Sequence, residues 1–75
     1  MNHTSFSEMA GRLGIRPALL YSVKTVARVV GVEASTIYDE IAAGRLKCML
    51  PEGRRQGKLI APEWVEEWIE KGVRP

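Results

Sequence analysis

Two short amphipathic stretches, separated by Gly31, constrain the fold of this chain more than any other feature. Apolar residues recur every three or four positions across residues 23–30 and again across residues 34–41, which is the spacing of one helix face. Ser22 is a favoured helix N-cap, and a glycine at position 31 suits the left-handed conformation that ends many helices. Two such helices joined by a glycine-containing turn predict a helix-turn-helix.

A β-hairpin is predicted after Gly44, the glycine that ends the second helix. Apolar and polar residues alternate over residues 46–50, which is typical of a half-buried strand. The turn segment, residues 51–57, contains one proline and two glycines, and residues 58–61 are typical of a returning strand. Basic residues cluster near the tip of this hairpin, and a hairpin that follows two such helices in the chain is predicted to form a wing beside them.

A third helix is predicted from Pro62 to about Gly72, because proline is favoured at the first helical position. Its apolar stripe comprises Trp64, Val65, Trp68 and Ile69. The same helix carries four glutamates, at positions 63, 66, 67 and 70. We interpret them as a solvated face or, alternatively, as a surface for a basic protein partner.

The first twenty residues allow two interpretations. Ser5 and Glu8 have the spacing of a capping box, and an apolar stripe follows at Phe6, Met9, Ala10 and Leu13. An isolated helix of this length is marginal in water. Residues 1–20 are therefore predicted to be either a tail or an accessory helix.

The length of 75 residues allows a single domain with a thin core. The predicted fold class is α+β, mainly α. It is a small winged helix-turn-helix of two helices, a two-stranded β-hairpin wing and a C-terminal helix, with or without an extra N-terminal helix. Residues 21–75 would form this domain, and residues 1–20 would precede it.

Few residues are available for catalytic or metal chemistry. Cys48 is the only cysteine, so no internal disulfide or multi-cysteine zinc site is expected, and we interpret it as a small buried residue. His3 is the only histidine. We therefore expect no enzyme activity, cofactor, metal or small-molecule ligand. No stretch is apolar enough for a secretory signal or a membrane span, so a cytoplasmic protein without membrane contact is expected.

Charge is distributed unevenly along the chain. Residues 45–58 carry five basic residues against one acid, whereas residues 62–71 carry four glutamates against one lysine. A basic segment of this kind is an electrostatic footprint for nucleic acid. Four further cations are predicted to contact DNA in addition to those of the hairpin tip: Lys24 and Arg28 on the first helix, Arg45 after the second helix, and Lys47 in the first strand of the hairpin.

Several runs of the sequence resemble the excisionase and MerR-like helix-turn-helix group. They are Tyr21–Ala27, Gly31-Val32, Ser35–Tyr38, Gly44–Leu46, Ile60–Glu63 and Val65–Ile69. The resemblance spans residues 20–71. It implies a winged helix of bacterial or phage origin that binds double-stranded DNA, with its second helix in the major groove. Small members are excisionases, which bend attachment-site DNA and assist an integrase without breaking a bond themselves.

The resemblance also implies a set of contact residues. Those facing the groove would be Ser35, Thr36, Tyr38 and Asp39. Those of the wing would be Arg54, Arg55, Gln56 and Lys58. For Tyr38 the sequence leaves two interpretations open, an aromatic at the edge of the core or a donor to a phosphate.

The second helix departs from the family pattern. Members of the group place Ser or Thr at the position of Glu33 and a basic residue near Asp39, whereas this chain has no basic residue between positions 33 and 44. Carboxylates repel phosphates, although Asp39 is a suitable acceptor for a cytosine amino group. Affinity is therefore predicted to depend on the wing and on Lys24 and Arg28.

Two alternatives to an excisionase remain at this stage. One is a small transcriptional regulator or the DNA-binding domain of a packaging protein. The other is a winged helix that has become a protein-interaction module, which the acidic second and third helices would suit. Regulators of the MerR group dimerise through a long coiled coil, and this sequence ends at Pro75 without heptads. We therefore expect monomers, or protomers in contact along repeated DNA sites.

Overall fold

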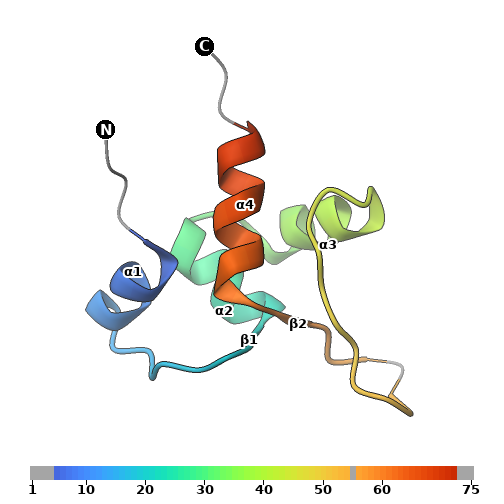
Figure 1. Cartoon of the computed structure of the whole chain (residues 1–75), viewed down its shortest axis with the longest axis horizontal. Coiled ribbons are helices and arrows are strands. Elements are labelled where there is room, and N and C mark those ends of the chain that lie inside the picture. The colour runs from blue at the N-terminus through green and yellow to red at the C-terminus, as the bar shows by residue number, and fades with distance from the viewer. Residues whose placement is uncertain (1–4, 55, 73–75) are drawn as a thin grey trace.

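A computed structural model of the chain describes residues 5–54 and 56–72. His3 and Arg55 lie outside the described residues. The elements are α1 (Phe6–Arg12), β1 (Tyr21–Ser22), α2 (Val23–Val30), α3 (Ala34–Ala42), β2 (Leu59–Ile60) and α4 (Pro62–Gly72). The described part of the chain is thus a small α-rich unit of four helices and a two-stranded antiparallel sheet (Figure 1).

Helices α2 and α3 form the predicted helix-turn-helix. The hydroxyl of Ser22 accepts a 3.2 Å hydrogen bond from the backbone N–H of Thr25, as an N-cap does. Gly31 has φ of 84° and closes α2 by donating its N–H to the carbonyl of Ala27. A side chain at this position would be strained, so the glycine fixes where α2 ends and where the chain turns into α3.

The core is built from one fully buried aliphatic side chain on each of four elements. These are Val26 of α2, Ile37 of α3, Ile60 of β2 and Val65 of α4. Half-buried Trp64 and Trp68 pack against this core from α4. The two tryptophans are one helical turn apart, so α4 closes the core by its predicted stripe. Ile69, the last residue of that stripe, stays 38% exposed.

Of the predicted two-stranded hairpin, the structure forms the returning strand, β2, and a single antiparallel bridge from it to Met49. Strand β2 pairs with β1, in the antiparallel register Tyr21 to Ile60 and Ser22 to Leu59. On the other edge of β2, Leu59 forms an isolated bridge with Met49, through two hydrogen bonds of 2.8 Å. We call residues 50–58, which connect the two bridged residues, the wing loop.

The strand prediction for residues 46–50 is wrong for a local reason. Leu46 lies in the core and is only 2% exposed. The backbone N–H groups of Arg45 and Leu46 both donate to the carbonyl of Glu40. These bonds hold the chain in a turn where an extended strand was expected. Pro51 has no N–H to continue the ladder beyond Met49. Cys48 is half-buried.

Helix α1 docks on the rest of the molecule. The capping box is present, since the Ser5 hydroxyl accepts from the Glu8 N–H at 3.1 Å and the Glu8 carboxylate accepts from the Ser5 N–H at 3.3 Å. Phe6 and Ala10 are buried, and the centroid of the Phe6 ring lies 5.0 Å from the centroid of the Tyr21 ring. The predicted stripe extends too far, because Leu13 caps the helix and is exposed.

None of the helices in the described residues is both long and apolar enough to cross a membrane.

Candidate nucleic-acid interface

The outward face of α3 presents the four predicted groove residues together. Ser35, Thr36, Tyr38 and Asp39 are all exposed, whereas Ile37 points into the core. Ser35 and Asp39 are one turn apart and occupy the middle of this face. The face is narrow, polar and free of bulky apolar groups other than Tyr38, which suits insertion of a helix into a groove.

Tyr38 links α3 to the wing loop. Its ring is 49% exposed, and the ammonium of Lys58 lies over it, 5.9 Å from the ring centroid. The two residues and Gln56 line a hollow of about 170 Å³. The structure therefore brings three predicted contact residues, from the helix and from the wing loop, to one place. It positions Tyr38 outside the buried core.

The tip of the wing loop is a tight turn. The backbone N–H of Arg54 donates to the carbonyl of Pro51 at 3.0 Å, and Gly53 between them has φ of 81°. The Arg54 side chain is exposed at this turn. Figure 1 shows the wing loop projecting away from the helices. Arg54 is therefore held exposed on a projecting turn, a position suited to contact with a phosphate backbone.

Lys24 and Arg28 are both exposed on α2, one turn apart. This spacing puts the two cations on one flank of the helix. They extend the cationic surface of the molecule to the first helix of the helix-turn-helix.

The start of α3 lacks the cap that most helices have. Glu33 occupies the N-cap position, and its side chain makes no capping hydrogen bond. Short side chains such as Ser, Thr or Asp reach the first-turn N–H groups, whereas glutamate does so poorly. The result is a carboxylate at the end of the helix where a phosphate would otherwise be favoured.

Glu40 faces α4 and not the outward face of α3. Its Oε1 accepts from Arg45 Nε and from Trp68 Nε1, both at 2.9 Å, and its Oε2 accepts from Arg45 Nη2 at 2.8 Å. We call Glu40, Arg45 and Trp68 the Glu40 cluster. Hydrogen bonds from Arg45 and Trp68 lower the pKa of the Glu40 carboxyl to about 2. The negative charge of Glu40 is therefore compensated within the fold.

Two of the cations predicted to contact DNA form ion pairs within the protein. Arg45 belongs to the Glu40 cluster, and Lys47 pairs with Glu67 of α4 at 3.4 Å. Glu67 also lies 3.9 Å from Lys71. The structure does not bring Arg45 and Lys47 together with the cations of the wing loop. Both remain exposed, so their ion pairs are weakly held.

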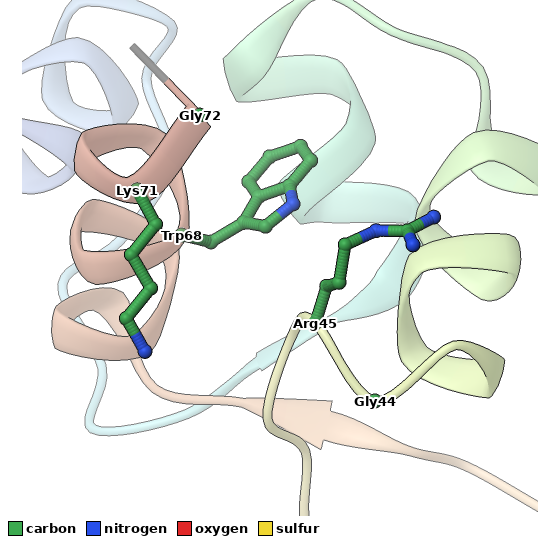
Figure 2. Close-up of a pocket in the computed structure, with 5 residues that line it drawn as sticks. All are labelled: Gly44, Arg45, Trp68, Lys71 and Gly72. Carbon is green, nitrogen blue, oxygen red and sulfur yellow. The ribbon is translucent and has the colours of Figure 1, made fainter. Parts of the chain in front are cut away.

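The Glu40 cluster borders a hollow of about 380 Å³. Figure 2 shows the Trp68 indole extending from α4 toward Arg45, whose guanidinium points to α3. The glycines Gly44 and Gly72 complete the lining, next to Lys71. Arg45 and Trp68 both donate to Glu40, so part of the polar edge of this hollow is already engaged within the protein.

Sequence reasoning missed the Glu40 cluster. Glu40 and Trp68 are 28 residues apart, and nothing in the spacing of either residue indicates the other. The five-residue separation of Glu40 and Arg45 spans the end of α3, so it is not the spacing of a pair on one helix face. Only the docking of α4 beside α3 brings the three side chains together.

Comparison with known proteins gives one match. The model of a family described as a helix-turn-helix domain matches residues 20–73, well over half of the chain. The matched segment begins next to β1, so α1 lies outside it. No curated protein and no solved structure matches the chain significantly.

Proposed function

The chain belongs to the helix-turn-helix domain family, a DNA-binding family, and from that membership we propose that it binds double-stranded DNA sequence-selectively without acting as an enzyme. Helix α3 would enter the major groove, and the wing loop would contact the adjacent backbone. The observation that carries the proposal is the outward face of α3, which is exposed and joined to the wing loop at Tyr38 and Lys58.

Selectivity is assigned to α3. Ser35 and Thr36 lie in its first turn and have hydroxyls that donate to or accept from base edges and phosphates. Asp39, one turn after Ser35, is an acceptor for a cytosine amino group. These three short side chains favour a small number of base contacts and close approach of the helix backbone to the groove.

Affinity is assigned to four cations around α3: Lys24, Arg28, Arg54 and Lys58. Within residues 5–54 and 56–72 none of the four takes part in an ion pair, in contrast to Arg45 and Lys47. Each contact between a cation and a phosphate releases counterions, so binding is expected to weaken steeply as salt rises. Arg55 joins this group by its sequence position.

We place the protein with the excisionases, as an architectural factor that bends DNA and assists an integrase. The sequence resemblance over residues 20–71 supports this role, and the wing loop supplies the second contact that a bending protein needs. Protomers would bind side by side on repeated sites. Selection of bound duplexes from a random pool, followed by footprinting, tests the role: repeated, phased sites are expected, with bending seen by circular-permutation assay.

A salt titration tests the DNA interface itself. In a gel-shift assay, Arg54→Ala is expected to weaken binding and to reduce the slope of log affinity against log salt by about 1. Lys47→Ala is the matched control, because it removes a cation of the same segment that pairs with Glu67. Absence of duplex binding at low salt, or equal losses in both variants, would contradict the proposed interface.

A further inference from the structure

An apolar groove lies on the side of the molecule formed by α1, α2 and α4. Its volume is about 150 Å³, and its apolar walls come from Met9 of α1, Val29 and Val30 of α2, and Ile69 of α4. Ile69 is 38% exposed although it belongs to the apolar stripe of its helix. The groove thus has room for an aliphatic side chain and offers it contacts from three helices.

One edge of the groove is acidic. Glu66 lines it, and Glu63 and Glu70, three residues before it and four after it on α4, share its face. Glu66 already accepts a hydrogen bond from the backbone N–H of Phe6 through Oε2 at 3.0 Å. Glu63 and Glu70 are both exposed to solvent. The edge is therefore complementary to lysine or arginine side chains.

The groove lies away from two parts of the proposed DNA interface, the outward face of α3 and the wing loop. Figure 1 shows α1 and α3 on opposite sides of α4, and the wing loop on the side away from α1. A molecule docked between α1 and α4 would leave the outward face of α3 uncovered. An acidic surface is also repelled by DNA, which favours a different type of ligand for this side.

We propose that this groove binds a basic segment of another protein, which places one aliphatic side chain between Val30 and Ile69 and its lysines or arginines along Glu63 and Glu70. A central apolar anchor with a charged rim is the usual anatomy of a protein contact. The protein would hold such a partner and DNA at the same time.

A second copy of this chain is the less suitable occupant. The most basic segment of this chain, residues 45–58, carries two exposed apolar residues, Met49 and Leu50, at the base of the wing loop. A protomer that inserted this segment into its neighbour would give up its own DNA contacts. The proposed ligand is therefore a segment of a different, basic protein.

The test uses the full chain in the absence of DNA, so its outcome is independent of the proposed DNA binding. The probe is a lysine-rich amphipathic helical peptide with two leucines one turn apart, and its control peptide carries serines at those positions. Nuclear magnetic resonance titration should shift the amide signals of Val29, Val30 and Ile69 with the leucine peptide only.

Three variants distinguish binding in the groove from non-specific attraction of the peptide to an acidic surface. Ile69→Ser is expected to weaken peptide binding roughly tenfold, because it removes most of an aliphatic anchor. Glu70→Gln should weaken it about threefold. Glu67→Gln is the matched control, since Glu67 does not line the groove and already contacts Lys47 and Lys71, and it should leave binding unchanged.

Three results would overturn the proposal. The first is the absence of shifts at millimolar peptide, and the second is equal weakening by Glu67→Gln and Glu70→Gln. The third is concentration-dependent self-association that Ile69→Ser abolishes, which would assign the groove to a second copy. Arg54→Ala should bind the peptide as wild type does, so loss of DNA binding and loss of partner binding are distinguishable.

Discussion

The indole Nε1 of Trp68 donates a 2.9 Å hydrogen bond to the carboxylate of Glu40, which joins α4 to the last turn of α3. The same carboxylate accepts two hydrogen bonds from Arg45, and the Glu40 carbonyl accepts the backbone N–H groups of Arg45 and Leu46. One residue therefore connects the helix proposed to enter the groove, the chain that leads to the wing loop, and the helix that closes the core.

Replacing Trp68 tests whether this connection positions α3. Trp68→Phe keeps an aromatic ring against the core but removes the indole N–H together with part of the ring volume. We expect a melting temperature lowered by a few degrees and a larger relative loss of affinity for the selected DNA site than for random duplex, because α3 would lose its fixed orientation. Thermal unfolding by circular dichroism and parallel gel shifts measure both effects.

Trp64→Phe is the matched control, since Trp64 lies one turn earlier on the same helix and takes no part in the hydrogen bonds of the Glu40 cluster. It is expected to change stability without separating specific from random DNA. Similar loss of selectivity in both variants would mean that α4 acts through packing alone.

The lowered pKa of Glu40 predicts how the stability of the fold changes at acidic pH. Its hydrogen bonds with Arg45 and Trp68 depress the pKa from 4.5 to about 2 in the folded chain. The ionised carboxyl therefore stabilises the fold fully above about pH 4.5, and that contribution is lost as pH falls toward about 2. Urea unfolding at a series of pH values should show stability declining through this window.

Glu40→Gln should flatten that decline, because the amide does not titrate. The variant keeps a similar shape and can still accept from the Trp68 indole. Its loss of stability relative to wild type should be greatest at neutral pH and shrink toward pH 2. A decline of the same steepness in wild type and Glu40→Gln would attribute the acid sensitivity to other carboxyls.

The helices of this chain could be predicted from its sequence because local signals define them. The spacing of apolar residues predicted α2, α3 and α4, and the caps at Ser22 and Gly31 lie where the pattern indicated. The strands could not be predicted in the same way. Alternation over residues 46–50 is a weak signal, and burial of Leu46 together with the backbone bonds to Glu40 outweighs it.

The candidate site shows the same division between local and tertiary information. Exposure of Ser35 and Asp39 follows from helix periodicity and was predictable. The environment of Arg45 was not, because its position in a basic segment indicates a DNA contact as readily as an ion pair. Which cations face outward is decided by the docking of α4, and periodicity carries no information about that contact.

We expect substitution by alanine to have opposite effects on stability at two glycines. Gly31→Ala should destabilise the fold by about 1–2 kcal/mol, because φ of 84° is a left-handed conformation that disfavours a side chain. Gly11→Ala should stabilise it by about 0.5–1 kcal/mol, since Gly11 lies within α1 and an added Cβ meets nothing within 4 Å. Urea unfolding measures both. No gain from Gly11→Ala would indicate that docking of α1 does not contribute to the cooperative transition.

Two variants at the uncapped start of α3 are expected to differ in DNA affinity although both raise stability. Glu33→Asp keeps the charge and shortens the side chain so that it reaches a first-turn N–H, and it should raise stability by about 0.5–1 kcal/mol while DNA affinity stays unchanged. Glu33→Ser adds the same cap and removes the carboxylate. Since phosphate is favoured at a helix N-terminus, Glu33→Ser should also raise DNA affinity several-fold at low salt. Urea unfolding and gel shifts on both variants give the comparison, and equal DNA affinities for the aspartate and serine variants would show that the start of α3 lies away from the phosphates.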